Sequence, residues 1–479
     1  MDDGQSTAQG STADDSILTH SAAVYRSEID VSTVDEKKLM WKLYNMDADL
    51  GLSDKQYLIC LSMFFFPYAL FEPASNVLMR RLKPSVWLSS MMFLWGIVMT
   101  LHGIVKNYHG LLALRLLLGL TEAGLYPGVV YYISSWYKRS ETGFRVAVFF
   151  SSATVAGAFS GLLAAGIAKM DRVGGRPGWA WIFILEGLAT VLLSIASFWM
   201  VQDFPDNAKF LTEIERVYVI RRLQADSKYS ASGEAFKRSY IWQSLKDWKT
   251  YVAMGLYMGF DGPLYAFSLF LPTIINQLGF GATRANLLSV PVYVWGCIMT
   301  CIIGYIGDRT GRRFHINLIL FSVGLVAYII LLTSKTAALS YFAVYLAISA
   351  IYPIIPNSVA WVANNVEGTY KRSVTLGMAI GFGNINGAVT ANIYRAEDRP
   401  WFRLGHGIVL MYIGIGLLST IIFAAFLARE NRLRDRRERD EVIDGVVNKY
   451  SHVRNGRYAS VEDARLHKGD EWSGFRYTM

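Results

Sequence analysis

The sequence Gly304-Tyr-Ile-Gly-Asp308-Arg-Thr-Gly-Arg-Arg313 joins two apolar runs that are each long enough to cross a bilayer. Glycines allow two helix ends to come close together, and the carboxylate of Asp308 can pair with a cation or cap a neighbouring helix. The three arginines favour the cytoplasmic side of a membrane. This stretch therefore predicts a cytoplasmic turn between two membrane-spanning helices, and it fixes which way round the chain crosses the bilayer.

The composition of the chain indicates that the bilayer is its solvent. The 479 residues are 53% hydrophobic and only 18% charged, and the mean hydropathy is positive, which a water-soluble single core does not explain. The net charge is +9, and the lysines and arginines fall mostly in loops and after Arg429. This distribution follows the positive-inside pattern, so we expect the lipid bilayer as a partner and no nucleic acid.

Motifs of enzymes and metal sites are missing from the sequence. Cys60, Cys297 and Cys301 lie in apolar runs, where a thiol packs as a small hydrophobic group, so neither a disulfide framework nor a zinc site is expected. The sequence also lacks a phosphate-binding loop, a nucleophile elbow and a His-Glu-x-x-His motif. We therefore expect no metal, no cofactor and no catalytic residue, and we do not expect an enzyme.

Eleven runs of about 20 apolar residues can be placed along the chain. They are 57–79, 86–105, 110–134, 146–168, 181–201, 251–275, 287–306, 314–333, 339–361, 373–394 and 407–428. Basic clusters follow the first, third, seventh and ninth runs, which places every second loop in the cytoplasm. The expected fold class is therefore all-α, a multi-pass membrane protein with about 11 transmembrane helices.

Charge and hydropathy divide the chain into five expected regions. They are a disordered N-terminal tail at 1–50, an N-terminal transmembrane half of five spans at 51–201, a cytoplasmic linker at 202–250, a C-terminal transmembrane half of six spans at 251–428, and a cytoplasmic tail at 429–479. The segment from Asn76 to Ser85 occupies the hairpin that corresponds to the Gly304 hairpin, and it keeps the basic cluster but lacks the glycine and the aspartate. This echo favours two duplicated halves about a central path.

Several independent motifs resemble those of one family. Gly304-x-x-x-Asp308-Arg309-x-Gly311-Arg312-Arg313 resembles the gating motif of the major facilitator superfamily. Within it, Arg115-x-x-x-Gly119-x-x-Glu122-Ala-Gly124-x-x-Pro127-Gly128 resembles the anion:cation symporter family, and Gly381-Phe-Gly383-Asn384-Ile-Asn386-Gly387 resembles its fungal allantoate, nicotinate and vitamin permease branch. The resemblance covers about Leu50 to Arg429 and implies a two-half helical bundle that works by alternating access.

The resemblance fails near the start of the chain. Similar proteins have a transmembrane helix between a charged Glu-Lys-Lys-Leu stretch and an Asp-Leu-Gly-Leu loop, but here Leu39 is followed almost at once by Asp49. The residues between them cannot span about 30 Å of hydrocarbon at about 1.5 Å per helical residue. Counting spans back from the Gly304 hairpin also places the N-terminal tail outside. We expect that the first helix is missing, either through a skipped exon or gene-model error or because the protein has eleven helices.

Two charged residues inside one predicted span are the leading site candidates. Arg115 and Glu122 lie seven positions apart, and so on nearly the same face of a helix. Charged groups in a span are costly and usually face a cavity. In the functional interpretation, Arg115 clamps a substrate carboxylate, and Glu122 contributes to the substrate site and carries a proton. In the structural alternative, both residues pair with neighbouring helices and hold the bundle together.

Three further polar residues in spans are candidates. Glu72 is either a second proton-coupling group or a structural one. Asp261 lies among glycines and Pro263, which predicts either a broken helix that exposes backbone to substrate or a plain kink. Asn384 lies in a glycine-rich series, and it either directs its amide at a substrate or serves helix packing alone.

Together the residues and the resemblance favour a proton-coupled secondary transporter of small organic anions such as nicotinate, allantoate or vitamin-like carboxylates. We expect a monomer in the plasma membrane whose partners are the anion, protons and lipid. The alternative is a non-transporting membrane sensor or an inactive truncated carrier, which the missing helix favours. An ion channel is disfavoured because no segment is typical of a selectivity filter.

Overall fold

The computed structural model describes residues 46–167, 170–226, 238–277, 282–334, 336–393 and 402–479. Most of these residues are helical, and the sheet among them is one parallel pair of two-residue strands, β1 (Val442–Ile443) and β2 (Arg457–Tyr458). The predicted all-α class is confirmed. The expected disordered tail lies, as far as residue 45, outside the described residues, and the described chain begins with the short helix α3 (Met46–Asp49).

The described helices of the first half cover the five runs predicted there. They are α4 (Asp54–Met63), α5 (Phe65–Leu82), α6 (Pro84–His102), α7 (Tyr108–Glu122), α8 (Leu125–Trp136), α9 (Arg139–Ile167) and α10 (Gly178–Met200). α4 and α5 together form one candidate span, and so do α7 and α8. Local signals set where helices begin, because Ser53 forms a capping box with Gln56 before α4, Asn107 caps α7 and Pro84 opens α6.

The remaining helices lie in the stretches that the sequence analysis assigns to the linker and the second half. The linker contains α11 (Glu213–Gln224) and α12 (Arg238–Lys246), and the second half contains α13 (Trp248–Gln277), α14 (Ala282–Thr310), α15 (Arg313–Thr333), α16 (Ala337–Asn364), α17 (Thr369–Thr390) and α18 (Arg403–Asp435). After α18 the chain forms β1, β2, α19 (Val461–Lys468) and a final 3-10 turn, η6 (Gly469–Glu471). The region predicted as a tail is therefore folded.

Nine helical segments of the described ranges are long and apolar enough to cross a membrane. α13 and α17 lie where two more spans are predicted, and polar residues such as Asp261 and Asn384 lower their hydropathy. The structure is thus that of a multi-pass membrane protein, and the count of eleven spans remains a prediction.

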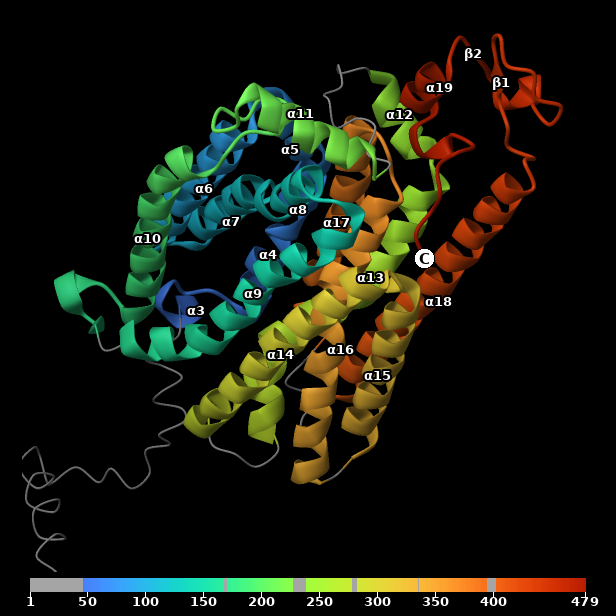
Figure 1. Ribbon diagram of the computed structural model, residues 1–479. Coiled ribbons are helices and arrows are strands. Elements are labelled where there is room, and N and C mark those ends of the chain that lie inside the picture. Colours follow the sequence, from blue (N-terminus) through green and yellow to red (C-terminus); the bar gives the residue numbers. More distant parts are fainter. Residues whose placement is uncertain (1–45, 168–169, 227–237, 278–281, 335, 394–401) are drawn as a thin grey trace, which may run out of the picture. The chain divides into compact units, whose positions relative to one another are not determined.

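The two halves meet along two pairs of helices. α5 packs along α17, and α9 packs along α14, as Figure 1 shows for the second pair. Glycines allow this close approach: a Cβ atom on Gly377 would lie 2.8 Å from Cα of Pro73, and one on Gly304 would lie 2.4 Å from Cβ of Ala147. The glycine of the opening motif therefore serves contact between the halves.

Of the two interpretations of Asp261, a broken helix and a plain kink, the structure does not show the broken helix. α13 is a single helix that runs through Asp261 and Pro263. The glycine before them packs against α18 instead of unwinding the chain, since a Cβ atom on Gly259 would lie 2.1 Å from Cα of Gly416. Neighbouring helices can compensate a proline in a span, so helical backbone persists here.

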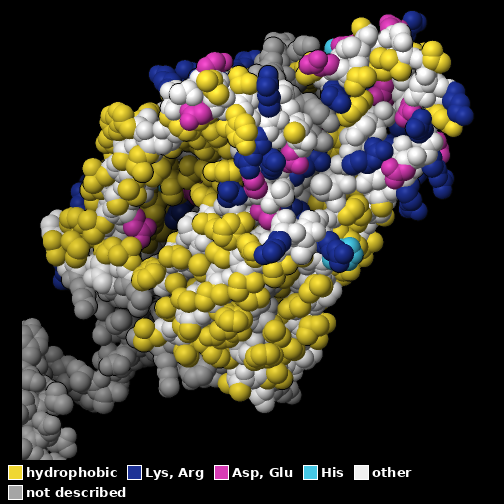
Figure 2. Space-filling view, viewed as in Figure 1, with side chains coloured by type: hydrophobic (Ala, Val, Ile, Leu, Met, Phe, Trp, Pro, Cys, Tyr) yellow, Lys and Arg dark blue, Asp and Glu magenta, His cyan; other side chains and the backbone are white. Residues whose placement is uncertain are grey.

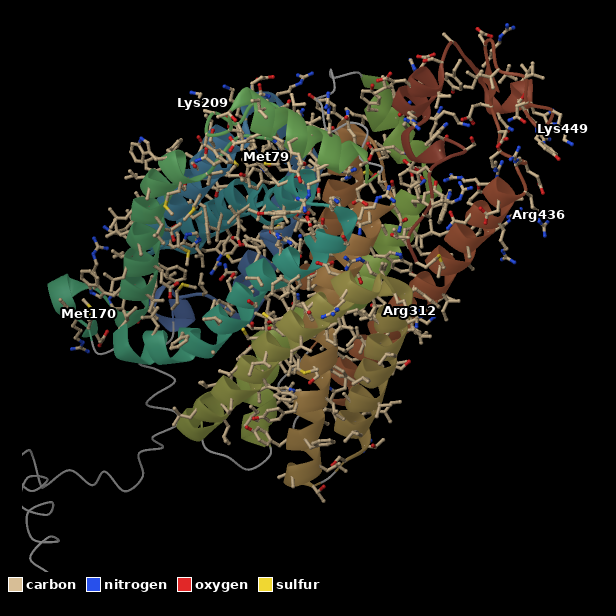
Figure 3. All side chains as sticks on the ribbon, viewed as in Figure 1. Met79, Met170, Lys209, Arg312, Arg436 and Lys449 are labelled. Atoms are coloured by element: carbon tan, nitrogen blue, oxygen red, sulfur yellow. The ribbon has the colours of Figure 1, made fainter. Side chains whose placement is uncertain are left out.

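One end of the bundle carries most of the charge. Lys and Arg side chains gather there around α11, α19 and the strands, while the lower surface of the second half is largely hydrophobic (Figure 2). Arg436 and Lys449 lie toward this end, and Met170 lies at the opposite side of the view (Figure 3). We call it the basic end, and it contains both the Gly304 hairpin and the residues after α18.

Candidate functional site

A buried carboxylate joins the two halves in the middle of the bundle. Glu72 on α5 is fully buried, and its Oε1 accepts a hydrogen bond of 2.8 Å from Nδ2 of Asn384 on α17. Oδ1 of Asn384 in turn accepts one of 2.8 Å from the hydroxyl of Tyr265 on α13. The second carboxylate oxygen, Oε2, has no hydrogen-bond partner within the described ranges. Two of the predicted residues are therefore in direct contact, from opposite halves.

Asp261 lies close to this chain of hydrogen bonds. It precedes Tyr265 by one turn of α13, so both side chains lie on the same face of that helix. The carboxyl groups of Asp261 and Glu72 are near enough for their charges to interact. Asp261 is 4% exposed, and among the described residues its Oδ2 has no hydrogen-bond partner. The structure thus brings two buried carboxyl groups together.

Glu122 on α7 lies near Tyr265, Tyr68 and Arg115. Glu122 interacts electrostatically with both tyrosines and with Arg115. The guanidinium of Arg115 lies over the ring of Phe183 on α10, 5.9 Å from its centroid, and its Nε has no hydrogen-bond partner in the described part of the chain. The predicted same-face arrangement holds, but the two side chains are not joined by an ion pair among the described contacts.

The surface is hollowed beside this helix. Figure 2 shows a recess between α10 and α7, the helix that carries Arg115 and Glu122. α10 packs along α6 and makes few contacts with α9. The site therefore borders a recess in the first half as well as the interface between the halves.

Sequence reasoning missed the tyrosines of the site. Tyr265 connects Asn384 to α13, and Tyr68 interacts electrostatically with the two glutamates of the site. With 27 tyrosines in the chain, a tyrosine in a span carries little information by itself. The spacing of Asp261 and Tyr265 on one helical face is the signal that could have identified the second of them.

The Gly304 hairpin fastens the two halves at the basic end. Oδ1 and Oδ2 of Asp308 accept hydrogen bonds from the backbone N–H groups of Gly143 (2.9 Å) and Phe144 (2.7 Å), near the start of α9. Arg313 pairs with Asp308 and donates to the carbonyl of Arg139 at 3.3 Å. The predicted capping role of Asp308 is therefore seen in the structure, together with a paired arginine.

The other motif residues have different positions. Gly311 has a φ of +65°, which a glycine adopts at little cost. Arg309 and Arg312 are exposed, and Arg309 donates to the hydroxyl of Tyr305 at 2.7 Å. These two arginines lie on the surface of the basic end and do not join the halves in the described contacts.

The hairpin of the first half makes a matching contact. Asn76 is fully buried, and its Nδ2 donates a hydrogen bond of 3.1 Å to the carbonyl of Ser373 near the start of α17. Arg80 on the same helix forms an ion pair of 3.0 Å with Asp206 of the linker. Each hairpin thus fixes the start of a helix in the opposite half.

No group of three or more His, Cys, Asp or Glu side chains in the described ranges is arranged to hold a metal ion.

Comparison with known sequences agrees with this architecture. Residues 39–391 match the sequence profile of the Major Facilitator Superfamily. Over 405 residues the chain is 34% identical to the MFS-type transporter cnsO of Penicillium expansum, in an alignment that covers 82% of this chain and 78% of that protein. It is 30% identical over 417 residues to the major facilitator-type transporter hxnP of Emericella nidulans, with 85% and 83% of the two chains covered.

Solved structures show the same fold. The chain is similar to the MFS proton:xylose symporter XylE with a TM-score of 0.64 and 13% identity, over 81% of this chain and 90% of that one. It is also similar to the human organic anion transporter MFSD10, with a TM-score of 0.53 and 13% identity, over 85% and 92%. The relatives are membrane transporters and not enzymes, and the chain belongs to the Major Facilitator Superfamily.

Proposed function

We propose that the chain is a proton-coupled carrier of small organic anions that works by alternating access. The observation that carries this proposal is Arg115, a partly buried guanidinium in a membrane-spanning helix for which no described carboxylate lies within ion-pair distance. A cation held in a span attracts an anion, and a planar guanidinium fits a carboxylate through two parallel hydrogen bonds. We therefore place a small carboxylate at Arg115.

The class of substrate follows from this chemistry and from the family resemblance. Residues 115–128 resemble the anion:cation symporter family, and the glycine-rich stretch around Asn384 resembles its fungal permease branch for allantoate, nicotinate and vitamins. Each of those substrates except some vitamins carries a carboxylate, the group that a guanidinium binds through two parallel hydrogen bonds. Asn384 and Asp261 complete the substrate site in this proposal.

In this proposal, carboxyl groups in the spans bind and release the coupled protons. Glu72 and Asp261 are buried with one oxygen each that lacks a hydrogen-bond partner among the described residues, and a buried carboxyl group avoids the cost of a bare charge by binding a proton. Glu122 interacts with the charge of Arg115. An anion bound at Arg115 withdraws that charge from Glu122, which then takes up a proton more readily, so binding of the two cargoes is coupled.

Alternating access requires that the halves part at the basic end, which the positive-inside pattern assigns to the cytoplasm. The contacts of Asp308 and Arg313 near the start of α9 stabilise the state that is closed there. A monomer suffices for this cycle, because one chain supplies both halves of the site. We place the carrier in the plasma membrane, where external anions and a proton gradient meet.

A non-transporting sensor or an inactive truncated carrier is the second candidate function. The recess between α10 and α7 favours it (Figure 2), because a twelfth helix in that place would enclose Arg115 and its substrate. The same recess is expected if the first helix is missing. Transport measurements separate the two candidates.

The test is uptake of radiolabelled nicotinate and allantoate into proteoliposomes that contain the purified chain under an imposed pH gradient. We expect uptake that the gradient accelerates, and we expect Arg115→Ala to lower it at least about tenfold, because a hydrogen bond to a charged group contributes about 1.5–3 kcal/mol. Arg172→Ala is the control, since that side chain is 91% exposed. Normal uptake by Arg115→Ala would exclude the clamp, and no uptake of any anion by the unaltered chain would favour the second candidate.

A further inference from the structure

The last eleven described residues fold back across the basic end of the bundle. We call Gly469–Met479 the C-terminal strap. Two of its three aromatic side chains are inside the protein: Phe475 is fully buried and Tyr477 is 6% exposed. The alternating charges of the sequence before the strap do not predict this burial. Neither the family resemblance nor the candidate site includes the strap. The strap therefore needs its own account.

Asp470 anchors the strap in a cluster of buried charges. Its carboxylate lies 2.8 Å from Nζ of Lys249 on α13 and 3.0 Å from Nζ of Lys371 on α17, and all three groups are almost completely buried. Asp247 contacts the same two ammonium groups, each at 2.8 Å. Burial alone would raise the pKa of Asp470, but the two lysines hold it below its usual range. Two carboxylates and two ammonium groups thus balance each other only while the strap is in place.

A second set of contacts fixes the strap to α18. Nη1 and Nη2 of Arg434 donate to the carbonyls of Phe475 (2.8 Å) and Asp470 (2.9 Å). Asn431 donates to the carbonyl of Tyr477 at 2.9 Å and accepts from its N–H group at 3.0 Å. These contacts hold the strap on the second half over most of its length.

The strap also reaches the first half. The guanidinium of Arg139, at the start of α9, lies over the ring of Phe475 at 4.3 Å from its centroid, and its Nη1 donates to the carbonyl of Arg476 at 3.1 Å. Arg139 is the residue whose own carbonyl accepts hydrogen bonds from Arg313 and Asn364 of the second half. The strap therefore touches the first half at the point where the gating motif fastens it.

The end of the strap continues into the gating motif. The carbonyl of Met479 accepts a hydrogen bond of 2.9 Å from the N–H group of Arg313. The carbonyl of Thr478 accepts from Nε1 of Trp361 at 2.9 Å and from Nδ2 of Asn365 at 3.0 Å. One short segment thus contacts α9, α13, α15, α16, α17 and α18, which belong to both halves.

We propose that the C-terminal strap is a latch, docked in a site formed by both halves, that holds the basic end closed and must release one of the two halves before that end can open. The inference rests on the proposed alternating-access function. Opening moves Arg139 away from the second half, and the strap cannot follow Arg139 and keep Asp470 between Lys249 and Lys371. Release of the second half in turn exposes Phe475 and leaves the two lysines with one carboxylate, so the docked strap favours the closed state.

The first measurement is hydrogen–deuterium exchange of the purified full chain, read by mass spectrometry. In the unaltered protein the amides of Tyr477 and Thr478 are hydrogen-bonded, so we expect slow exchange in the strap. Asp470→Asn should raise the exchange rate of the strap at least tenfold. Asp444→Asn is the matched control, because it removes an exposed carboxylate that pairs with exposed Arg457 on the surface.

The second measurement tests whether the strap controls the halves. Ser373→Cys places a thiol at a fully buried position beside Asn76, between the halves, and its alkylation is read by peptide mass spectrometry alongside the native Cys60, Cys297 and Cys301. We expect Asp470→Asn to speed alkylation there several-fold, and Asp444→Asn to leave it unchanged. Ser358→Cys reports on general loosening, because it is buried within the second half beside Asn317, and it should stay unreactive.

Three results would overturn the latch. The first is fast hydrogen–deuterium exchange of the strap in the unaltered chain. The second is faster exchange of the strap in Asp470→Asn without faster alkylation at position 373. The third is an equal increase in the alkylation rate at positions 373 and 358. If Asp470→Asn aggregates, Phe475→Ala gives the same test with the ion cluster intact, since it removes the contact with Arg139. Neither measurement uses a substrate, so a failed uptake assay with faster alkylation would reject the proposed function and keep the latch.

Discussion

At the scale of single residues, Asp308 and Asn76 each bind the start of a helix in the opposite half, one as a hydrogen-bond acceptor and the other as a donor. Asp308 accepts hydrogen bonds from two backbone N–H groups near the start of α9, where the helix dipole favours negative charge. Asn76 donates one hydrogen bond to a backbone carbonyl near the start of α17. A charged acceptor binds about twice as strongly as a neutral group. The two hairpins are therefore unequal, and the Asp308 hairpin is the stronger fastening.

Glu72 gives the prediction that belongs to this scale. Glu72→Gln keeps an oxygen that can accept the hydrogen bond from Asn384, but it can no longer bind and release a proton. If Glu72 carries protons, accumulation driven by a pH gradient should be lost while exchange of labelled for unlabelled anion continues. Both are measured in proteoliposomes.

Glu213→Gln is the control for that experiment, because Glu213 lies in the linker and its side chain is 75% exposed. It should leave both activities unchanged. Gradient-driven accumulation by Glu72→Gln at the unaltered rate would assign Glu72 to packing of α5 against α17, and would leave Glu122 as the candidate proton carrier.

At the scale of helices, hydropathy predicted nearly every element and failed where contacts between distant segments decide. The apolar runs located the spans because lipid demands continuous apolar helices. At Asp261 the sequence left a broken helix and a plain kink open, and the helix is continuous there because Gly259 is used for contact with α18. The strap was read as solvated tail, because nothing local shows that Asp470 meets Lys371, 99 positions away. Burial of that kind is decided by tertiary contacts.

The candidate site shows the same limit. Glu72 and Asn384 could each be identified as polar residues in spans, but their hydrogen bond joins positions 312 residues apart. Arg115 and Glu122 were placed correctly on one face, because helical periodicity is a local property. The sequence could not supply the neighbours of that face. Arg115 lies over the ring of Phe183, and Glu122 interacts electrostatically with Tyr265.

Contact between α5 and α17 gives the prediction for this scale. A Cβ atom on Gly377 would lie 2.8 Å from Cα of Pro73, and backbone atoms cannot move aside as a flexible side chain can. Gly377→Ala should destabilise the protein by about 1–3 kcal/mol, as overpacking usually does, and should lower the midpoint of thermal unfolding in detergent. Gly414→Ala on α18 should be neutral, because nothing lies within 4 Å of a Cβ atom there. Equal midpoints for the two variants would mean that the helices are not in close contact.

At the scale of the whole molecule, the described spans of the two halves are not equally buried. The second half surrounds its buried residues, and α16 is largely enclosed, whereas α10 is the least buried of the nine candidate spans in the described ranges. α10 leans on α6 and has little contact with α9, and the surface between α10 and α7 is hollowed (Figure 2). The short stretch between Leu39 and Asp49 is where the family resemblance leads us to expect a helix. We propose that the recess is the place of that helix.

This proposal predicts a gain from adding a helix. Inserting a transmembrane helix of about 20 apolar residues, with small residues along one face, between Leu39 and Asp49 should raise the midpoint of thermal unfolding and raise anion uptake, because in this proposal it covers apolar surface of α10 and encloses Arg115. A polyleucine helix of equal length should raise neither the unfolding midpoint nor the uptake, since it lacks the small residues that allow close packing. An added span also reverses the side on which the N-terminal tail lies, so protease digestion of a tag there should change with either insert. If uptake by the unaltered chain is already as fast as with the inserted helix that carries small residues, the recess belongs to a complete eleven-helix carrier and the missing-helix proposal fails.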